Sequence, residues 1–287
     1  MTDLLTLHEI GAAGVAEILA LAGQDELGTP LAGQGVALMF AKPSARTRNS
    51  MEMAVVQLGG HPVYIQAEEV GLGERETAED IANTLACYHS VIAARVKDHG
   101  HLTAMAAAVE TPVLNMLSDT DHPLQGLADL LTIRQLTGRL EGAKVAYVGD
   151  GNNNVAKSLA EGCALTGAQL TIASPEEFQL AAPPEGVRQV VSPAEAVAGA
   201  QVVYTDVWVS MGQAEETARR NAALAPYQVD EALMALTDDA WFLHCLPARR
   251  GEEVDAAVID GPRSGVWRQA ENRMHTARAA LAWMLAR

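Results

Sequence analysis

The segment Ser44–Arg48 carries two arginines and two hydroxyl side chains within five residues. It follows an apolar run, residues 35–39, and precedes apolar residues spaced i, i+4 and i+7 from Met51. This order predicts a buried strand, a turn and a helix that begins near Ser44 or Ala45. Free backbone N–H groups and the positive end of the helix dipole point out of such a turn, and arginine adds forked donors. The chemistry predicts a site for a dianion such as phosphate.

Polar side chains follow several other predicted strands. Strands that alternate with helices indicate parallel sheets, and right-handed crossovers bring the carboxyl ends of the strands to one edge. In two facing sheets of this kind, the turns after the strands can converge on one cleft. Six polar residues share this position: Arg46, Arg95, His122, Asn154, Asp206 and Cys245.

His122 and Gln125 lie three residues apart across a proline-containing turn before a predicted helix. A neutral imidazole N–H can polarise a carbonyl group, and a carboxamide oxygen can accept from an NH₂ group. The alternative is a helix cap in which Asp121 is the capping residue. The sequence alone leaves both interpretations open.

The turn Gly149–Asn154 is rich in glycine and asparagine and resembles a P-loop, because Lys157 and Ser158 follow Gly151 at nearly the right spacing. Ala156, however, stands where a P-loop needs the backbone freedom of glycine. Asparagine amides suit a zwitterion better, since one amide can serve a carboxylate or an ammonium group. A P-loop-like nucleotide-binding protein therefore stays as the weaker alternative.

Two later motifs add polar chemistry. Asp206 and Ser210 place a carboxylate and a hydroxyl after a strand, where they can hold an ammonium group; an ordinary exposed loop is the alternative. His244 and Cys245 are adjacent on a predicted strand, so they point to opposite faces and cannot act as a nucleophile pair. No set of histidine, cysteine and carboxylate residues has metal-ligand spacing, so we predict no metal site.

Composition limits the function further. The 287-residue chain has a formal net charge of -16, which argues against a nucleic-acid or anionic-membrane surface. Its three cysteines are scattered, which is typical of a reducing compartment. No signal-peptide pattern and no apolar run of about 18 residues is present, so we expect a cytoplasmic location. A mobile loop over Glu68–Asp80, a last strand over Val266–Gln269 and a closing helix from Glu271 complete the predicted elements.

Five ordered motifs resemble the aspartate/ornithine carbamoyltransferase superfamily, and the later ones resemble its ornithine branch. They are Ser44–Arg48, His122–Gln125, Asp206–Gly212, His244–Pro247 and Glu271–Arg273. The resemblance implies an α/β fold with two domains, each a parallel sheet flanked by helices, and a C-terminal helix that packs back on the first domain. Residues 1–136 with helix 271–287 would bind carbamoyl phosphate, and residues 137–270 would bind ornithine. A homotrimer or an assembly of trimers is implied, without a cofactor.

The resemblance implies carbamoyl transfer from carbamoyl phosphate to the δ-amine of L-ornithine, giving L-citrulline and phosphate. Another amine, such as N-acetylornithine, putrescine or aspartate, is the alternative within the family, and a relative that only binds is a further one. The carbamoyl-phosphate site would contain Ser44, Ala45, Arg46, Thr47, Arg95, His122, Gln125, Cys245, Leu246 and Arg273. Among these, the catalytic residues would be Arg46, Arg95, His122 and Cys245. The ornithine site would contain Asn154, Asp206, Ser210 and Met211.

The chain departs from the family pattern at two positions. Ala45 stands where the family usually has a threonine, so one hydroxyl is missing from the phosphate turn. Gly71 stands where the ornithine enzymes usually have a glutamine that reaches into the neighbouring subunit. Three consecutive asparagines also leave a choice over which one meets the substrate, and we favour Asn154.

Overall fold

The computed structural model describes residues 2–209 and 216–287, except for the side chain of Ala67. Ser210 and Met211, which the resemblance assigns to ornithine binding, lie outside this part of the chain. The chain divides into two compact units, Met1–Ala128 with Glu271–Arg287, and Asp129–Ala270. The division falls inside helix α6 (Pro123–Thr137), and the predicted boundary after residue 136 lies at the end of the same helix.

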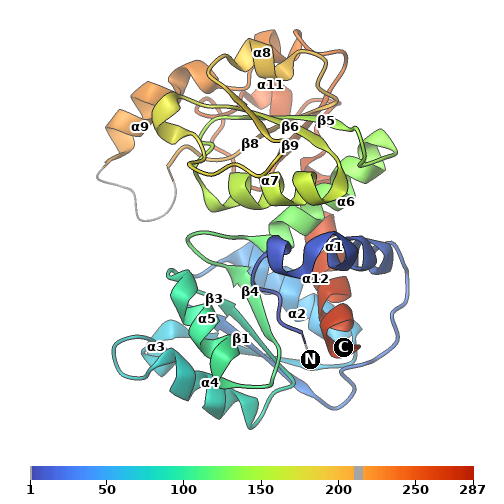
Figure 1. The fold of residues 1–287 in the computed structure, drawn as a ribbon, viewed down its shortest axis with the longest axis vertical. Coiled ribbons are helices and arrows are strands. Elements are labelled where there is room, and N and C mark those ends of the chain that lie inside the picture. The colour runs from blue at the N-terminus through green and yellow to red at the C-terminus, as the bar shows by residue number, and fades with distance from the viewer. Residues whose placement is uncertain (1, 210–215) are drawn as a thin grey trace. The chain divides into compact units, whose positions relative to one another are not determined.

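Within its described residues, the first unit contains a four-stranded parallel sheet in the order β2-β1-β3-β4. The inner strands are continuous apolar runs because helices cover both faces of the sheet. Figure 1 shows α4 and α5 on one side of this sheet and α1, α2 and α12 on the other. The strands are β1 (Gly35–Phe40), β2 (His61–Gln66), β3 (Val91–Arg95) and β4 (Val113–Leu117). The helices are α1 (Leu7–Ala22), α2 (Ala45–Gln57), α3 (Ala67–Val70), α4 (Ala78–Ala86), α5 (His99–Ala108) and the larger part of α12 (Val266–Leu285).

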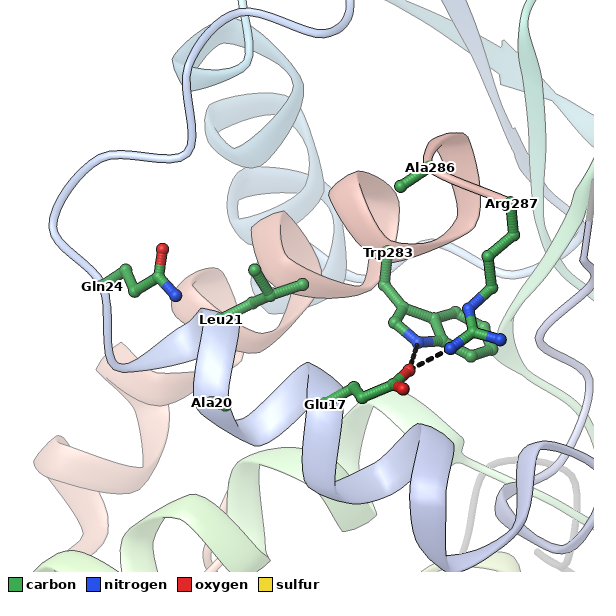
Figure 2. Close-up of a pocket in the computed structure, with 7 residues that line it drawn as sticks. All are labelled: Glu17, Ala20, Leu21, Gln24, Trp283, Ala286 and Arg287. Carbon is green, nitrogen blue, oxygen red and sulfur yellow. Dashed lines mark hydrogen bonds and ion pairs between the residues drawn. The ribbon is translucent and has the colours of Figure 1, made fainter.

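The C-terminal helix packs on the first unit, as predicted. Trp283 of α12 donates an indole N–H to the Glu17 carboxylate of α1 at 2.6 Å, and Arg287 pairs with the same carboxylate (Figure 2). Farther along α12, Arg278 donates to the backbone oxygens of Gln24 and Asp25, just after α1 ends. These contacts join the two ends of the chain in one unit.

The second unit contains a parallel sheet in the order β7-β6-β5-β8-β9. In Figure 1, α7 lies on one side of this sheet, and α8 and α11 lie on the other. The strands are β5 (Lys144–Val148), β6 (Gln169–Ala173), β7 (Arg188–Val190), β8 (Val202–Thr205) and β9 (Trp241–His244). The helices are α7 (Asn154–Thr166), α8 (Pro193–Val197), α9 (Thr217–Leu224), α10 (Glu231–Met234), α11 (Ala256–Ile259) and the short 3-10 turns η1 (Glu176–Phe178) and η3 (Ala225–Tyr227). The predicted fold class, two parallel sheets flanked by helices, is confirmed.

Two predicted elements are wrong. Val266–Gln269 is the first turn of α12 and not a strand, because a run of four residues does not distinguish the two periods. The predicted loop Glu68–Asp80 contains α3, the start of α4 and a compact turn in which Glu74 and Arg75 donate backbone N–H groups to Gly71. Among the described residues, no helix is long and apolar enough to cross a membrane.

Candidate active site

The phosphate-type turn forms at the start of α2. Ser44 is the N-cap with an extended backbone, and its hydroxyl oxygen accepts the Thr47 N–H at 3.4 Å. The predicted helix start is therefore confirmed. Thr47 is buried, whereas Ala45 and Arg46 are exposed, and the first turn of α2 carries no acidic residue. An uncompensated positive helix end beside an arginine favours a bound anion.

The two arginines of this turn have different surroundings. Arg48 pairs with Glu52 at 2.7 Å and stacks over the Tyr64 ring at 3.9 Å, so its charge is compensated within the fold. Arg46 forms no ion pair with any residue that the structure describes. Arg46 is thus the arginine available to an incoming anion.

A buried polar cluster follows the strands of the first unit. Arg95, the last residue of β3, donates to the Thr47 hydroxyl at 3.4 Å, which connects β3 to the start of α2. Arg273 of α12 donates to the Gln125 side-chain oxygen at 2.6 Å, which connects α12 to α6. Arg273 lies about two turns inside α12, because the helix begins at Val266 and not at Glu271 as predicted.

His122 lies directly before α6 and is buried. Burial lowers its pKa well below the usual 6.5, and the positive charges of Arg273 and then Arg95 lower it further. A protonated imidazole is disfavoured here, so His122 is a neutral ring near neutral pH. A neutral imidazole beside two guanidinium groups can act as a hydrogen-bond donor without being an acid.

The asparagine turn of the second unit is a helix cap. Asn153 is the N-cap of α7, and its side-chain oxygen accepts the N–H groups of Val155 and Ala156 at 2.9 and 2.8 Å. Its amide nitrogen donates to the Tyr147 hydroxyl and to the Asp150 backbone oxygen. Asn153 is therefore fully engaged in the fold.

This cap also bears on the two alternatives for the turn. A P-loop binds phosphate through backbone N–H groups at the helix start, but here Asn153 occupies two of those groups. The turn therefore does not have P-loop geometry. Asn153 and Asn154, the first residue of α7, are both partly buried, and Asn153 has no free amide atom for a substrate.

Asp206 and Cys245 meet beyond the ends of β8 and β9. The Cys245 thiol donates to the Asp206 carboxylate at 3.0 Å, and the same carboxylate oxygen accepts the Val207 N–H at 2.8 Å. Asp206 is buried and Cys245 is partly buried. The second unit thus brings together two of its predicted site residues, a carboxylate and a thiol.

His244 lies close enough to Asp206 and Cys245 for metal binding, since the possible ligand atoms of the three residues are within 4.8 Å of one another. However, the Nδ1 atom of His244 accepts the Leu246 N–H at 2.8 Å, and Nε2 lies 3.1 Å from the Glu253 carboxylate. Both ring nitrogens are engaged, so the imidazole offers no lone pair to a cation without losing one of these contacts.

Two buried charged residues near the site were not predicted. Arg220 of α9 pairs with Asp150 and also donates to the Trp208 backbone oxygen at 2.8 Å. Glu253, at 0% exposure, holds His244. Neither has a local sequence signal, because both partners are distant in sequence or separated by a loop. Of the residues in these contacts, Asp150 lies in the glycine- and asparagine-rich turn that the sequence indicated.

Comparison with known proteins gives consistent results over both units. The family model described as aspartate/ornithine carbamoyltransferase, carbamoyl-P binding domain, matches residues 2–135. The model described as aspartate/ornithine carbamoyltransferase, Asp/Orn binding domain, matches residues 141–284.

Individual relatives match over almost the whole length. An ornithine carbamoyltransferase of Hyperthermus butylicus is 47% identical over 305 residues, which cover 99% of this chain and 97% of the relative. The structure of the ornithine carbamoyltransferase from Pyrococcus furiosus is similar with a TM-score of 0.91 at 41% identity, covering 98% of this chain and 96% of that chain. The structure of the Thermus thermophilus ornithine carbamoyltransferase has a TM-score of 0.90 at 42% identity and covers 99% of both chains.

Proposed function

The chain belongs to the aspartate/ornithine carbamoyltransferase family, and from this premise we propose that it transfers the carbamoyl group of carbamoyl phosphate to the δ-amine of L-ornithine, giving L-citrulline and phosphate. Two features of the first unit carry the proposal: a helix start without acidic residues at Arg46, and a buried His122 whose pKa is lowered by burial and by the charges of Arg273 and Arg95. One ligand with a dianionic end and a neutral carbonyl end suits both features.

The phosphate end of carbamoyl phosphate is bound by the start of α2. Ser44, Ala45, Arg46 and Thr47 supply backbone N–H groups, a hydroxyl and a guanidinium group. The absence of an acidic residue in this turn supports that role, because nothing there competes with an anion. Ala45 contributes its backbone N–H and not a side chain, so the missing hydroxyl removes only one donor.

The carbamoyl end is bound by the buried cluster. Arg95, Thr47 and the N–H of neutral His122 donate to the carbonyl oxygen, which gains negative charge as the tetrahedral centre forms. Gln125, whose side-chain oxygen already accepts from Arg273, can accept from the carbamoyl NH₂ group as well. Losing one such donor typically costs roughly 100- to 1000-fold in kcat.

The amino-acid substrate is bound by the second unit. Asp206 holds the α-ammonium group, and Asn154 serves the α-carboxylate; Ser210 and Met211 are assigned by motif alone. Cys245, hydrogen-bonded to Asp206, and Leu246 complete the site beside the reacting amine. Asp206 favours a free α-ammonium group, and hence ornithine over N-acetylornithine.

The reaction balances without an added reactant. The neutral δ-amine attacks the carbamoyl carbon and forms the C–N bond of the tetrahedral centre, which then collapses as the C–O bond to phosphate breaks, and the departing phosphate takes the amine proton. Holding the two reactants in line supplies roughly 7–11 kcal/mol of the barrier reduction. The enzyme is proposed to work as a homotrimer or an assembly of trimers in the cytoplasm, as the family resemblance implies.

The assay combines purified protein and carbamoyl phosphate with ornithine, N-acetylornithine, putrescine or aspartate, and measures phosphate and ureido product. We expect product with ornithine at a kcat/KM at least tenfold above that of the other amines. Product with another amine at a higher kcat/KM would reassign the substrate, and no product with any amine would contradict the function.

The Arg46→Ala variant tests the phosphate site. Losing a charge-assisted hydrogen bond of about 1.5–3 kcal/mol should weaken carbamoyl-phosphate binding roughly 10- to 100-fold in calorimetry. Arg48→Ala is the matched control, because Arg48 is already paired with Glu52 and Tyr64. Equal losses in both variants would contradict the assignment of Arg46.

A further inference from the structure

The turn that follows β9, residues 245–247, has a backbone conformation that its own residues do not favour. Leu246 has φ +61°, the left-handed region that side chains other than glycine rarely adopt. Such conformations persist only where surrounding contacts determine them, and they occur often at functional sites. Cys245, which contacts Asp206, lies directly before this residue.

The contact that holds Leu246 comes from the His244 ring. Its Nδ1 atom accepts the Leu246 N–H at 2.8 Å and so carries no hydrogen. The neutral ring must then carry its hydrogen on Nε2, which lies 3.1 Å from the Glu253 carboxylate and donates to it. Glu253 therefore selects the tautomer of His244 that can accept from Leu246.

The arrangement is fixed on both sides of His244. Its backbone N–H donates to the Gln269 side chain at 2.9 Å, and Gln269 in turn donates to Asp129 at 2.6 Å. The Glu253 oxygen that accepts from His244 also accepts the Arg249 N–H at 2.6 Å, which ties the end of the turn to the same carboxylate. A buried hydrogen-bond network thus surrounds the turn on both sides.

Glu253 is not explained by stability alone. Its side chain is fully buried, and its second oxygen, Oε2, has no hydrogen-bond partner among the described residues. A buried carboxylate that is only half satisfied lowers stability compared with an apolar residue of the same size. The hydrogen bonds that its first oxygen, Oε1, accepts from His244 and Arg249 therefore indicate a role in positioning these residues.

We propose that Glu253 is a positioning residue for carbamoyl transfer, acting through the His244 ring to hold the Leu246 backbone and thereby to present Cys245 at Asp206. Glu253 does not touch the substrates in this assignment. The role of the turn in catalysis rests on the proposed function, whereas the control of the turn by Glu253 and His244 does not.

The test uses two substitutions of His244 that each retain one half of the ring. In His244→Asn, the amide oxygen overlies Nδ1 and can still accept the Leu246 N–H, but the contact with Glu253 is lost. In His244→Gln, the amide overlies Nε2 and keeps Glu253 as its partner, but Leu246 loses its acceptor. We expect His244→Gln to lower kcat/KM by up to about 100-fold and His244→Asn to retain most of it.

Substitutions of Glu253 complete the experiment. Glu253→Gln keeps an oxygen that accepts from His244 and should stay close to the wild type, whereas Glu253→Leu should lose activity. In the His244→Asn background, Glu253→Leu should cause little further loss, because the ring through which Glu253 acts is absent. Glu252→Leu is the matched control, since Glu252 pairs with Arg249 at the surface.

A second readout does not depend on the transferase reaction. The rate of Cys245 alkylation by iodoacetamide, located by mass spectrometry, should rise several-fold in His244→Gln and Glu253→Leu, and circular dichroism should show that the variants are folded. A wild-type protein without transferase activity would overturn the proposed function, and the alkylation rates would still test the turn. If folded His244→Gln and His244→Asn have equal alkylation rates and equal activity, the positioning role is wrong. Should Glu253→Leu fail to fold, the two His244 variants decide the question.

Discussion

His122 shows how the same residue type can be held neutral in a strongly positive environment. Its pKa lies well below 6.5 because it is buried and because Arg273 and Arg95 are near. A protonated ring would lose hydration and meet two like charges, so the donor to a carbonyl oxygen is the neutral imidazole. An activity profile that depends on His122 should therefore show no inflection from this ring near pH 6.5.

The lowered pKa of His122 also predicts a pH dependence of stability. The unfolded chain takes up a proton near pH 6.5, whereas the folded chain resists it, so the unfolded state binds more protons below that pH. The contribution of His122 is fully present above pH 6.5 and is lost as the pH falls toward the folded-state pKa. The slope from one such proton is at most about 1.4 kcal/mol per pH unit.

Urea unfolding of the wild type and of His122→Gln at several pH values below 6.5 measures this slope. His122→Gln lacks this proton uptake on unfolding. Its free energy of unfolding should therefore fall less steeply toward acid pH than that of the wild type, by up to about 1.4 kcal/mol per pH unit. His8→Gln, a substitution of an exposed histidine of α1, controls for the loss of an imidazole. Parallel curves for the wild type and His122→Gln would show that His122 is not held neutral.

At the scale of elements, an ion pair joins the ends of two strands in the second unit. Arg220 of α9 pairs with Asp150 after β5 and donates to the Trp208 carbonyl oxygen after β8. The Thr205 hydroxyl adds a 2.6 Å hydrogen bond to the Val148 carbonyl oxygen. These contacts fix the spacing of the two turns that carry Asn154 and Asp206.

Removing one partner of this ion pair leaves a buried charge. Burial already raises the pKa of Asp150 despite the opposing effect of Arg220. We expect Arg220→Met to lower the free energy of unfolding by about 3–5 kcal/mol in urea titration. Arg219→Met, which removes the exposed pair with Glu177, should change it by less than about 0.5 kcal/mol. The double variant Asp150→Asn/Arg220→Met should be more stable than the sum of the single changes predicts; simple additivity would argue against a coupled pair.

The elements also show what a sequence can and cannot predict here. The start of α2 was predictable, because Ser44 after an apolar run is a local capping signal with a local partner. The start of α12 was not predicted although Ser264 and Gly265 precede it, because Val266–Gln269 is too short to show a helical period and its Gln269 side chain finds its partners in Asp129 and His244, far away in sequence. Short apolar runs are decided by such distant contacts.

For the candidate site as well, the sequence predicted some features and the structure was needed for others. The sequence indicated Arg95, His122 and Arg273, but not that burial, together with the charges of Arg273 and Arg95, lowers the pKa of the imidazole. The sequence also did not show that Asn153 is used by the fold as the cap of α7, which follows from the structure. Glu253 belongs to none of the motifs. Its proposed role follows only from the structure, in which the Glu253 contact at Nε2 and the Leu246 contact at Nδ1 together fix the tautomer of His244.

At the scale of the whole molecule, the proposed trimer requires a surface where copies meet. The outer side of α2, the helix that begins at the phosphate turn, exposes Met53 and Val56 by 46% and 51%. They are three residues apart and so lie next to each other on the helix. Another copy that packed on this side of α2 would remove the apolar area of both side chains from water.

We therefore expect light scattering to give a mass of three times the 30.3 kDa chain, or a multiple of it. Met53→Asp combined with Val56→Asp should shift the mass toward that of a single chain, because burying two carboxylates in an apolar contact costs more than the contact supplies. Leu236→Asp is the control, as Leu236 is similarly exposed, at 54%, but belongs to the second unit. A monomeric wild type would contradict the trimer, and a double variant that keeps the wild-type mass would place the contact elsewhere. If the mass falls in the double variant alone, the surface beside the phosphate turn is the one through which the copies assemble.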